Sequence, residues 1–377
     1  MIFKNGRVFT ENGIFENKDV IIEGDKITKI GENLSYDGEV YDLKGKKLLP
    51  GFIDIHTHGC GGYDFCDGKK EYFEDMAKVY IKFGVTTAMT TSMTVSKEDL
   101  RKSFSVYKDF ADNQGAQGTR LAGINMEGPF LSVSKKGAHI EEYIIPGDIE
   151  LFKELNELSG NRVKLVDVAP EVEGNLDFIE KAKDMVTVSV AHTNGDYNVC
   201  MEAYKKGATN TTHLFNAMTP LSHRDPGAVG AACDSDAFVE LICDGFHIHP
   251  AVLRTAFKIF GEDRICIISD SMRACGMPDG VYDLGGQDVY VKNGTATLEN
   301  GVIAGSVANS HMGVKNLINY GIKEETVLKS ATINPAKAIK MDDEIGSIKE
   351  GKLADLLIVD DDYNIEAVYR DGVKQDI

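Results

Sequence analysis

Apolar and β-branched runs alternate with amphipathic segments through the middle of the chain. Eight compact runs have the length and composition of buried strands: Leu48–Ile55, Gly84–Thr91, Leu121–Met126, Val163–Val168, Val186–Ala191, Ala208–Thr212, Phe238–Cys243 and Arg264–Ile268. Most are followed by a segment with the apolar spacing of a helix: Glu71–Phe83, Lys97–Phe110, Glu150–Leu158, Leu176–Lys183, Val199–Lys206 and Ala251–Phe260. Strands that alternate with helices in this way predict an α/β fold, a (β/α)8 TIM-like barrel, over residues 48–340.

The two ends of the chain have a different pattern. Short strands separated by Asn-Gly and Gly-Asp turns are expected at Ile2–Phe9, Val20–Glu23 and Lys26–Ile30. Similar strands return at Leu356–Asp360 and Ile365–Arg370. The N-terminal part has too little apolar content to fold alone. We therefore expect residues 1–47 and 341–377 to combine into one small, discontinuous β domain.

Composition and charge limit the partners of the protein. Hydrophobic residues make up 42% and charged residues 27% of the chain, as in an ordinary globular protein, so disorder is not expected. The net charge of -18 argues against binding to nucleic acid or anionic membranes, and an anionic substrate would need a local cationic pocket.

Three further features indicate a cytoplasmic protein. The N-terminal residues MIFKNGRVFT form neither a signal peptide nor an Arg-rich presequence. No segment approaches ~20 uninterrupted apolar residues, so no membrane span is expected. The seven cysteines are odd in number and form no CxxC pair, which favours free thiols in a reducing compartment.

Chemistry in a barrel of this kind lies at the C-terminal ends of the strands. Six metal-binding or acidic side chains follow the predicted strands at these points: His56, His58, Glu127, His192, His213 and Asp270. His56 and His58 are two residues apart, so both leave the same face of a strand, where two imidazoles can chelate a divalent metal. Glu127 adds a carboxylate oxygen. Asp270 is either a further ligand or a base that takes a proton from water.

The six residues together are stronger evidence for a metal site than any one of them alone. One histidine alone is more often an ordinary polar residue than a ligand. Four histidines and two acids at predicted strand ends are much harder to explain without a metal. Cysteine nucleophiles are a competing explanation, but no cysteine lies at a strand end beside a histidine. The glycine-rich stretches lack a phosphate-binding pattern and are expected to be loops.

Longer motifs resemble the amidohydrolase superfamily. They are the Pro50–Gly59 segment, PGFIDIHTHG, and the tail from Thr332 to Leu356, which is typical of members with a small β-sandwich built from both termini. Within the superfamily the chain is most similar to the N-acetylglucosamine-6-phosphate deacetylases. This resemblance covers essentially the whole chain, and it rests on motifs such as Asn125–Phe130, Lys136–His139 and His213–Met218.

The resemblance implies a role for each matching residue. Glu127, His192 and His213 would hold the main catalytic metal, and Asp270 would activate water and then protonate the leaving amine. His139 would polarise the acetyl carbonyl. Binding of the phosphorylated amino sugar would involve Ala138, His139, Asn216, Ala217, Arg224, His247, Ile303, Ala304 and Gly305. Some phosphate contacts in this family come from a neighbouring subunit, which implies a homodimer.

The sequence leaves open which carboxylate replaces a bridging lysine and how many metal ions bind. Many amidohydrolases bridge two metals with a carboxylated lysine at the end of strand four, but here that strand ends Asp167-Val168-Ala169. Glu127 can supply the missing carboxylate, which weakens a hydantoinase or dihydroorotase interpretation. Because His56 and His58 are retained, one or two ions are possible, with zinc or iron expected.

Three alternatives remain. Deacetylation of the galactosamine epimer differs by the orientation of one hydroxyl, which the sequence does not resolve. Another amidohydrolase reaction, such as cleavage of a cyclic amide, is the second. A non-catalytic scaffold is the third, although all six candidate positions are intact. Arg224 has its own alternative, a surface salt bridge with Asp225.

Overall fold

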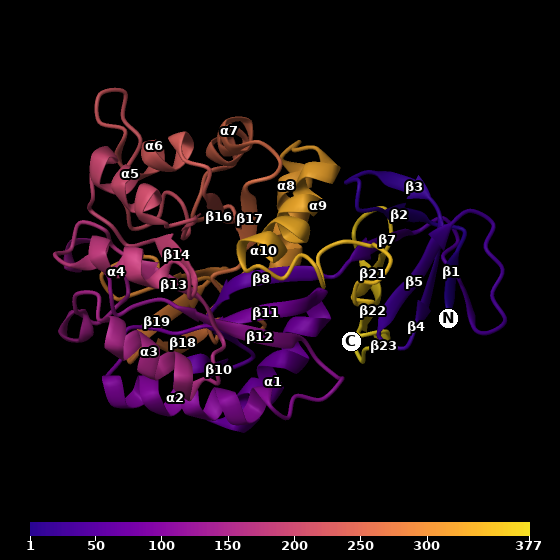
Figure 1. Ribbon diagram of the computed structural model, residues 1–377, viewed down its shortest axis with the longest axis horizontal. Helices are drawn as coiled ribbons and strands as arrows, with labels where there is room; N and C mark the ends of the chain where they lie inside the picture. Colours follow the sequence, from indigo (N-terminus) through magenta and orange to yellow (C-terminus); the bar gives the residue numbers. More distant parts are fainter.

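The computed structural model describes residues 1–377 and is centred on an eight-stranded parallel sheet (Figure 1). Its strands follow chain order: β8 (Phe52–Thr57), β11 (Val85–Thr91), β12 (Arg120–Met126), β13 (Val163–Val168), β14 (Thr187–Val190), β15 (Asn210–Thr211), β16 (Phe238–Ile242) and β17 (Ile265–Ile268). Backbone hydrogen bonds from His58 N to Ser271 O and from Asp270 N to His56 O join the last strand to the first. The predicted (β/α)8 barrel is confirmed.

Helices surround this sheet (Figure 1). They are α1 (Lys70–Tyr80), α2 (Lys97–Ala111), α3 (Ile149–Leu158), α4 (Asn175–Ala182), α5 (Tyr197–Lys206), α6 (Gly227–Asp234), α7 (Pro250–Phe260), α8 (Ser310–Asn319), α9 (Glu324–Ala331) and α10 (Ile333–Ala338). The pattern did not predict α6, because it is buried and made largely of glycine and alanine, so it shows no amphipathic stripe. None of the helices has both the length and the apolar character needed to cross a bilayer.

The first predicted strand is wrong as a single element. The run Leu48–Ile55 divides at Gly51 into β7 (Lys47–Pro50) and β8, which belong to different sheets. A Cβ atom at Gly51 would lie 2.0 Å from Oγ1 of Thr86, so only glycine fits where the chain passes from one sheet to the other. Both halves are buried and apolar, and composition alone therefore does not separate them.

The terminal segments form two sheets beside the barrel (Figure 1). One contains β5 (Lys26–Gly31), β4 (Asp19–Glu23), β1 (Ile2–Lys4) and β6 (Val40–Asp42). The other contains β23 (Val373–Lys374), β22 (Ile365–Arg370), β21 (Leu356–Val359), β7, β2 (Arg7–Phe9) and β3 (Phe15–Asn17). Phe3 and Val8 share a core with Ile358 and Tyr369. This core supports our proposal that residues 1–47 and 341–377 form a small β-sandwich domain beside a barrel of residues 48–340, with β7 crossing that boundary.

A three-stranded sheet that the pattern did not predict follows the last barrel strand. It contains β18 (Gly280–Leu284), β19 (Gln287–Lys292) and β20 (Thr295–Thr297). Leu284, Val289 and Val291 pack with Met93 and Met272, which lie in loops after β11 and β17. The sheet therefore rests on loops at the C-terminal ends of the barrel strands, next to the expected site.

Candidate metal centre and active site

The strand ends bring the predicted ligands around one carboxylate. Oε1 of Glu127 lies 3.0 Å from Nε2 of His213, 3.1 Å from Nε2 of His192 and 3.5 Å from Nε2 of His56. Oε2 lies 3.1 Å from Nε2 of His58. All five side chains are buried. They form two overlapping groups with metal-ligand spacing, one of His56, His58 and Glu127 and one of Glu127, His192 and His213.

The donor set fits a divalent metal. Nε2 of His192 and Nε2 of His213 lie only 3.0 Å apart and face the same carboxylate oxygen. Nε2 of His56 is buried without a hydrogen-bond partner, although it points into the cluster. Burial acts to raise the pKa of Glu127, but the surrounding histidines hold it well below its usual value. An ionised carboxylate among imidazole nitrogens is a donor set that divalent metals such as zinc accept.

Outer partners orient two of the imidazoles. His192 donates from Nδ1 to the carbonyl oxygen of Lys135 at 2.7 Å, which leaves Nε2 free to coordinate. His56 donates from Nδ1 to Oε2 of Glu240 at 3.1 Å, and Asn210 donates to Oε1 of the same carboxylate at 2.8 Å. Glu240 is fully buried on β16. It is the one acidic residue of the run Phe238–Cys243, a signal that sequence reasoning missed.

Three residues around the cluster, His192, His213 and Asp270, have a left-handed backbone conformation. The φ angles are 42° at His192, 29° at His213 and 49° at Asp270, each just past the end of a barrel strand. Non-glycine residues avoid this region, at a cost of about 1–3 kcal/mol each, and such strain gathers at functional sites. The turn at each strand end coincides with a side chain that points to the cluster.

Asp270 has the position of a base beside the cluster. Its Oδ1 lies 3.2 Å from Nε2 of His58 and 3.6 Å from Nε2 of His56. Burial acts to raise the pKa of Asp270, but the hydrogen bond with His58 and the charge of His56 lower it. The carboxylate is therefore ionised and can accept a proton.

His139 lies on the Oε2 side of Glu127. Its Nε2 is 3.5 Å from that oxygen. The backbone N–H of Thr94 donates to Nδ1 at 3.2 Å, which places the ring proton on Nε2. Burial lowers the pKa of His139 to about 4, so the ring is neutral at neutral pH. A neutral imidazole with its N–H directed into the site is a hydrogen-bond donor for a substrate carbonyl.

A cavity of about 610 Å³ opens onto the cluster. Its lining includes most of the predicted substrate-binding residues: Ala138, His139, Asn216, Ala217, His247, Ile303 and Gly305. Ala304 is buried outside the lining, and Arg224 is exposed in the loop before α6 and does not line the cavity. Sequence reasoning missed several lining residues, among them Lys135, Asn300 and Leu284, because no strand-end position marks them.

His247 presents one ring nitrogen to this cavity. Its Nδ1 donates to Oδ2 of Asp244 at 2.7 Å, which leaves Nε2 free. Burial acts to lower the pKa of His247, but the bond with Asp244 and the charge of that carboxylate raise it. This pair can therefore place positive charge near a bound anion.

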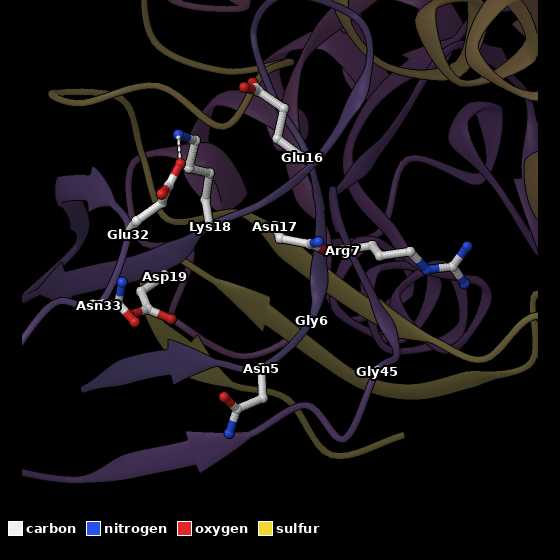
Figure 2. A pocket seen from close by; sticks show the side chains of 10 residues that line it. All are labelled: Asn5, Gly6, Arg7, Glu16, Asn17, Lys18, Asp19, Glu32, Asn33 and Gly45. Carbon is white, nitrogen blue, oxygen red and sulfur yellow. Dashed lines mark hydrogen bonds and ion pairs between the residues drawn. The ribbon is translucent and has the colours of Figure 1, made fainter.

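A second hollow, of about 670 Å³, lies on the small β unit (Figure 2). Lys18 pairs there with Glu32, and the lining holds no histidine or cysteine. It thus offers no cluster with metal-ligand spacing, and the barrel cavity is the candidate active site.

Comparison with known proteins agrees with the geometry. The model of the amidohydrolase family matches residues 48–374. The chain belongs to the amidohydrolase family. It is therefore a hydrolase, and the resemblance seen in the Pro50–Gly59 segment and the tail is confirmed.

Relatives within this family match along nearly their whole length. The N-acetylglucosamine-6-phosphate deacetylase of Bacillus subtilis is 36% identical, over 97% of this chain and 94% of the relative. The N-acetylgalactosamine-6-phosphate deacetylase of Escherichia coli O157:H7 is 30% identical, over 98% of both chains. A structure of the Mycobacterium smegmatis N-acetyl-D-glucosamine-6-phosphate deacetylase, an aspartate-to-alanine mutant in complex with N-acetyl-D-glucosamine-6-phosphate, superposes with a TM-score of 0.93 at 29% identity, covering 99% of this chain and 98% of that one.

Proposed function

We propose that this amidohydrolase removes the acetyl group of N-acetylglucosamine 6-phosphate, giving glucosamine 6-phosphate and acetate in amino-sugar catabolism. The observation that carries the proposal is the arrangement of the site. The carboxylate of Glu127 is surrounded by histidines, and Asp270 and His139 lie beside it in the lining of one cavity. The named relatives support the choice of substrate.

Glu127, His192 and His213 would hold the main divalent metal. A second ion, if bound, would be held by His56, His58 and Glu127. Zinc and iron both suit these nitrogen and oxygen donors. A bound ion supplies Lewis acidity, which polarises the amide carbonyl and makes water nucleophilic at neutral pH.

The protein's own groups carry the protons. Asp270 accepts a proton from the attacking water, because its carboxylate is ionised, and then delivers it to the amine nitrogen as the C–N bond breaks. His139 donates its Nε2–H to the carbonyl oxygen, where negative charge develops. The buried position of both groups strengthens these interactions.

The sugar phosphate would lie against Ala138, Asn216, Ala217, His247 and the Ile303–Gly305 segment. Because Arg224 is exposed outside this cavity, we propose that it reaches the cavity of a second copy in a homodimer. We also propose a cytoplasmic location, which the seven free thiols support.

The phosphate requirement gives a direct test. We expect kcat/KM for acetate release to be at least about 100-fold higher for the 6-phosphorylated sugar than for N-acetylglucosamine, because charged hydrogen bonds to the phosphate are lost with it. Acetate would be measured enzymatically for both sugars under the same conditions. Equal turnover of the two would overturn the substrate assignment.

The galactosamine epimer is the second candidate, which the relative from Escherichia coli O157:H7 supports. The same acetate assay with N-acetylgalactosamine 6-phosphate would separate the two. A higher kcat/KM for this epimer would reassign the substrate while leaving the reaction unchanged.

Glu240 offers a test of the metal centre that does not depend on turnover. In Glu240→Gln the buried carboxylate that orients His56 is lost, and we expect metal affinity to fall about 10- to 100-fold. Metal content after dialysis against graded chelator would be measured by mass spectrometry. Thermal unfolding of the metal-free protein is the control. A lower unfolding temperature with unchanged metal affinity would contradict the orienting role and indicate a structural one.

A further inference from the structure

Asp167 is a buried carboxyl group that the proposed mechanism does not use. It lies near the end of β13, the fourth barrel strand, and it is fully buried. Its Oδ1 accepts a hydrogen bond from Oγ1 of Thr212 at 2.6 Å, and its Oδ2 has no hydrogen-bond partner in the chain. A buried carboxyl group with one hydrogen bond is unfavourable for folding, because it has lost its hydration. Any role of Asp167 through hydrogen bonding is therefore a role through Thr212.

Thr212 follows β15 directly and precedes the ligand His213. Because β14 separates β13 from β15, the side chains of Asp167 and Thr212 meet inside the barrel. The hydroxyl of Thr212 also contacts Oγ of Ser189 at 2.6 Å, and its backbone N–H donates to the carbonyl oxygen of Val190 at 3.0 Å. The residue before His213 is thus held by both its side chain and its backbone.

Ser189 belongs to a hydrogen-bonded chain that reaches a second histidine of the cluster. Asn210 donates to Oγ of Ser189 at 3.1 Å and to Oε1 of Glu240 at 2.8 Å, and Glu240 accepts from Nδ1 of His56. All of these residues are fully buried. Since Ser189 accepts from Asn210, its own hydrogen is free for Thr212. The hydroxyl of Thr212 therefore has one donor and one acceptor, which fix its direction.

The ring of His213 has no outer partner of its own. Nδ1 of His192 and Nδ1 of His56 each have an acceptor, but Nδ1 of His213 is buried without a hydrogen-bond partner in the chain. Ligating histidines normally have such a partner, which fixes the orientation of the ring. The φ of 29° at His213 is also strained, and such a conformation persists only where its surroundings hold it. The direction of this imidazole therefore depends on the turn that carries it.

We propose that Asp167 and Thr212 are positioning residues for the metal centre: the Thr212 hydroxyl, fixed between Asp167 and Ser189, holds the strained turn that directs His213 at the metal. This inference rests on the proposed function and deepens it, because it takes His213 as a ligand of the catalytic metal. Neither Asp167 nor Thr212 lines the cavity, so both act on the metal through other residues.

Four substitutions separate the hydrogen bond from the space that the side chains fill. Asp167→Leu keeps a branched side chain and removes the acceptor, and Thr212→Val keeps the shape and removes the hydroxyl. Asp167→Asn and Thr212→Ser retain an acceptor and a hydroxyl. Thr187→Val is the matched control. Thr187 lies two residues before Ser189 on β14, is buried, and donates to the carbonyl oxygen of Ala338 at 2.9 Å, away from the ligands.

The experiment measures the affinity of each metal-free protein for each equivalent of Co²⁺ by competition with a chelator. We expect Asp167→Leu and Thr212→Val to weaken the binding of one equivalent about 10- to 100-fold. The visible absorption of bound Co²⁺ should change as well, because it reports the coordination geometry. Asp167→Asn and Thr212→Ser should stay within a few fold of the wild type. The double variant Asp167→Leu/Thr212→Val should lose no more affinity than either single variant, since all three lack the same hydrogen bond.

Thermal unfolding of the metal-free proteins separates positioning from general stability. Thr187→Val should unfold at a lower temperature and bind Co²⁺ as the wild type does. An equal loss of affinity in Thr187→Val, or losses that add in the double variant, would overturn the role of the pair. Unchanged affinity in Thr212→Val would overturn it even if Asp167→Leu failed to fold.

The proposed function has a separate readout. Failure of the metal-loaded wild type to release acetate from N-acetylglucosamine 6-phosphate would overturn the proposed function. The Co²⁺ affinities are measured without substrate, so they would still decide whether Asp167 and Thr212 position His213.

Discussion

Asp270→Asn should lower kcat by about 10³-fold and change KM little, because the amide cannot take a proton from water or return one to the leaving amine. The other carboxylate of the centre, Glu127, is held by imidazoles on both oxygens. Turnover would be measured by acetate release with the phosphorylated sugar at saturating concentration.

The control for this variant is Asp288→Asn. Asp288 is exposed on β19, in the sheet that packs beside the site, and it forms no ion pair. It should retain wild-type turnover. Metal content must be measured for Asp270→Asn, because Oδ1 lies 3.2 Å from Nε2 of His58. Undiminished kcat in the metal-loaded variant would remove Asp270 as the base.

Glu127→Gln should lose both the main metal and the activity. The carboxylate has Nε2 atoms of five histidines within 3.5 Å, and it is the only negative charge between His192 and His213. A neutral amide offers one weak oxygen donor in its place. Because even outer partners of metal ligands alter affinity by 10- to 100-fold, loss of the ligand itself should reduce affinity by more than about 10³-fold. Metal content by mass spectrometry and kcat would be measured on the same sample.

Glu142→Gln is the matched control, since Glu142 is an exposed glutamate with no ion pair, in the short helix after the His139 loop. It should bind metal and turn over as the wild type does. A Glu127→Gln protein that keeps stoichiometric metal through dialysis would show that the imidazoles alone suffice. Glu127 would then not be a ligand.

The sequence predicts the barrel well because its strands are buried on both faces. A run such as Ile265–Ile268 is continuously apolar and would be unfavourably exposed outside a core, so the strand and its burial are predicted together. The positions of the site residues are predicted by the same barrel. Because parallel strands have their C-terminal ends on one side, His192 and His213 lie close together, and the helix between them does not alter this.

Other features depend on contacts between distant residues. The protonated nitrogen of His56 is set by Glu240, which is 184 residues away, and that of His139 by the backbone of Thr94. The break at Gly51 reflects the close approach of Thr86. The short strands β18–β20 were missed because the Gly285-Gly286 turn between β18 and β19 reads as a loop in sequence. Arg224 matches the motif but lies outside the cavity of its own chain.

The pairing of β7 with β21 has a consequence for biosynthesis. β7 pairs with β2 early in the chain, but its other edge pairs with β21, which is synthesised about 300 residues later. At 5–20 residues per second, the ribosome needs on the order of 15–60 s to supply that partner. During this time Leu48 and Leu49 are in a nascent chain with one open strand edge, which favours chaperone binding or aggregation. We therefore expect slower translation over the barrel to lower the yield of the folded enzyme.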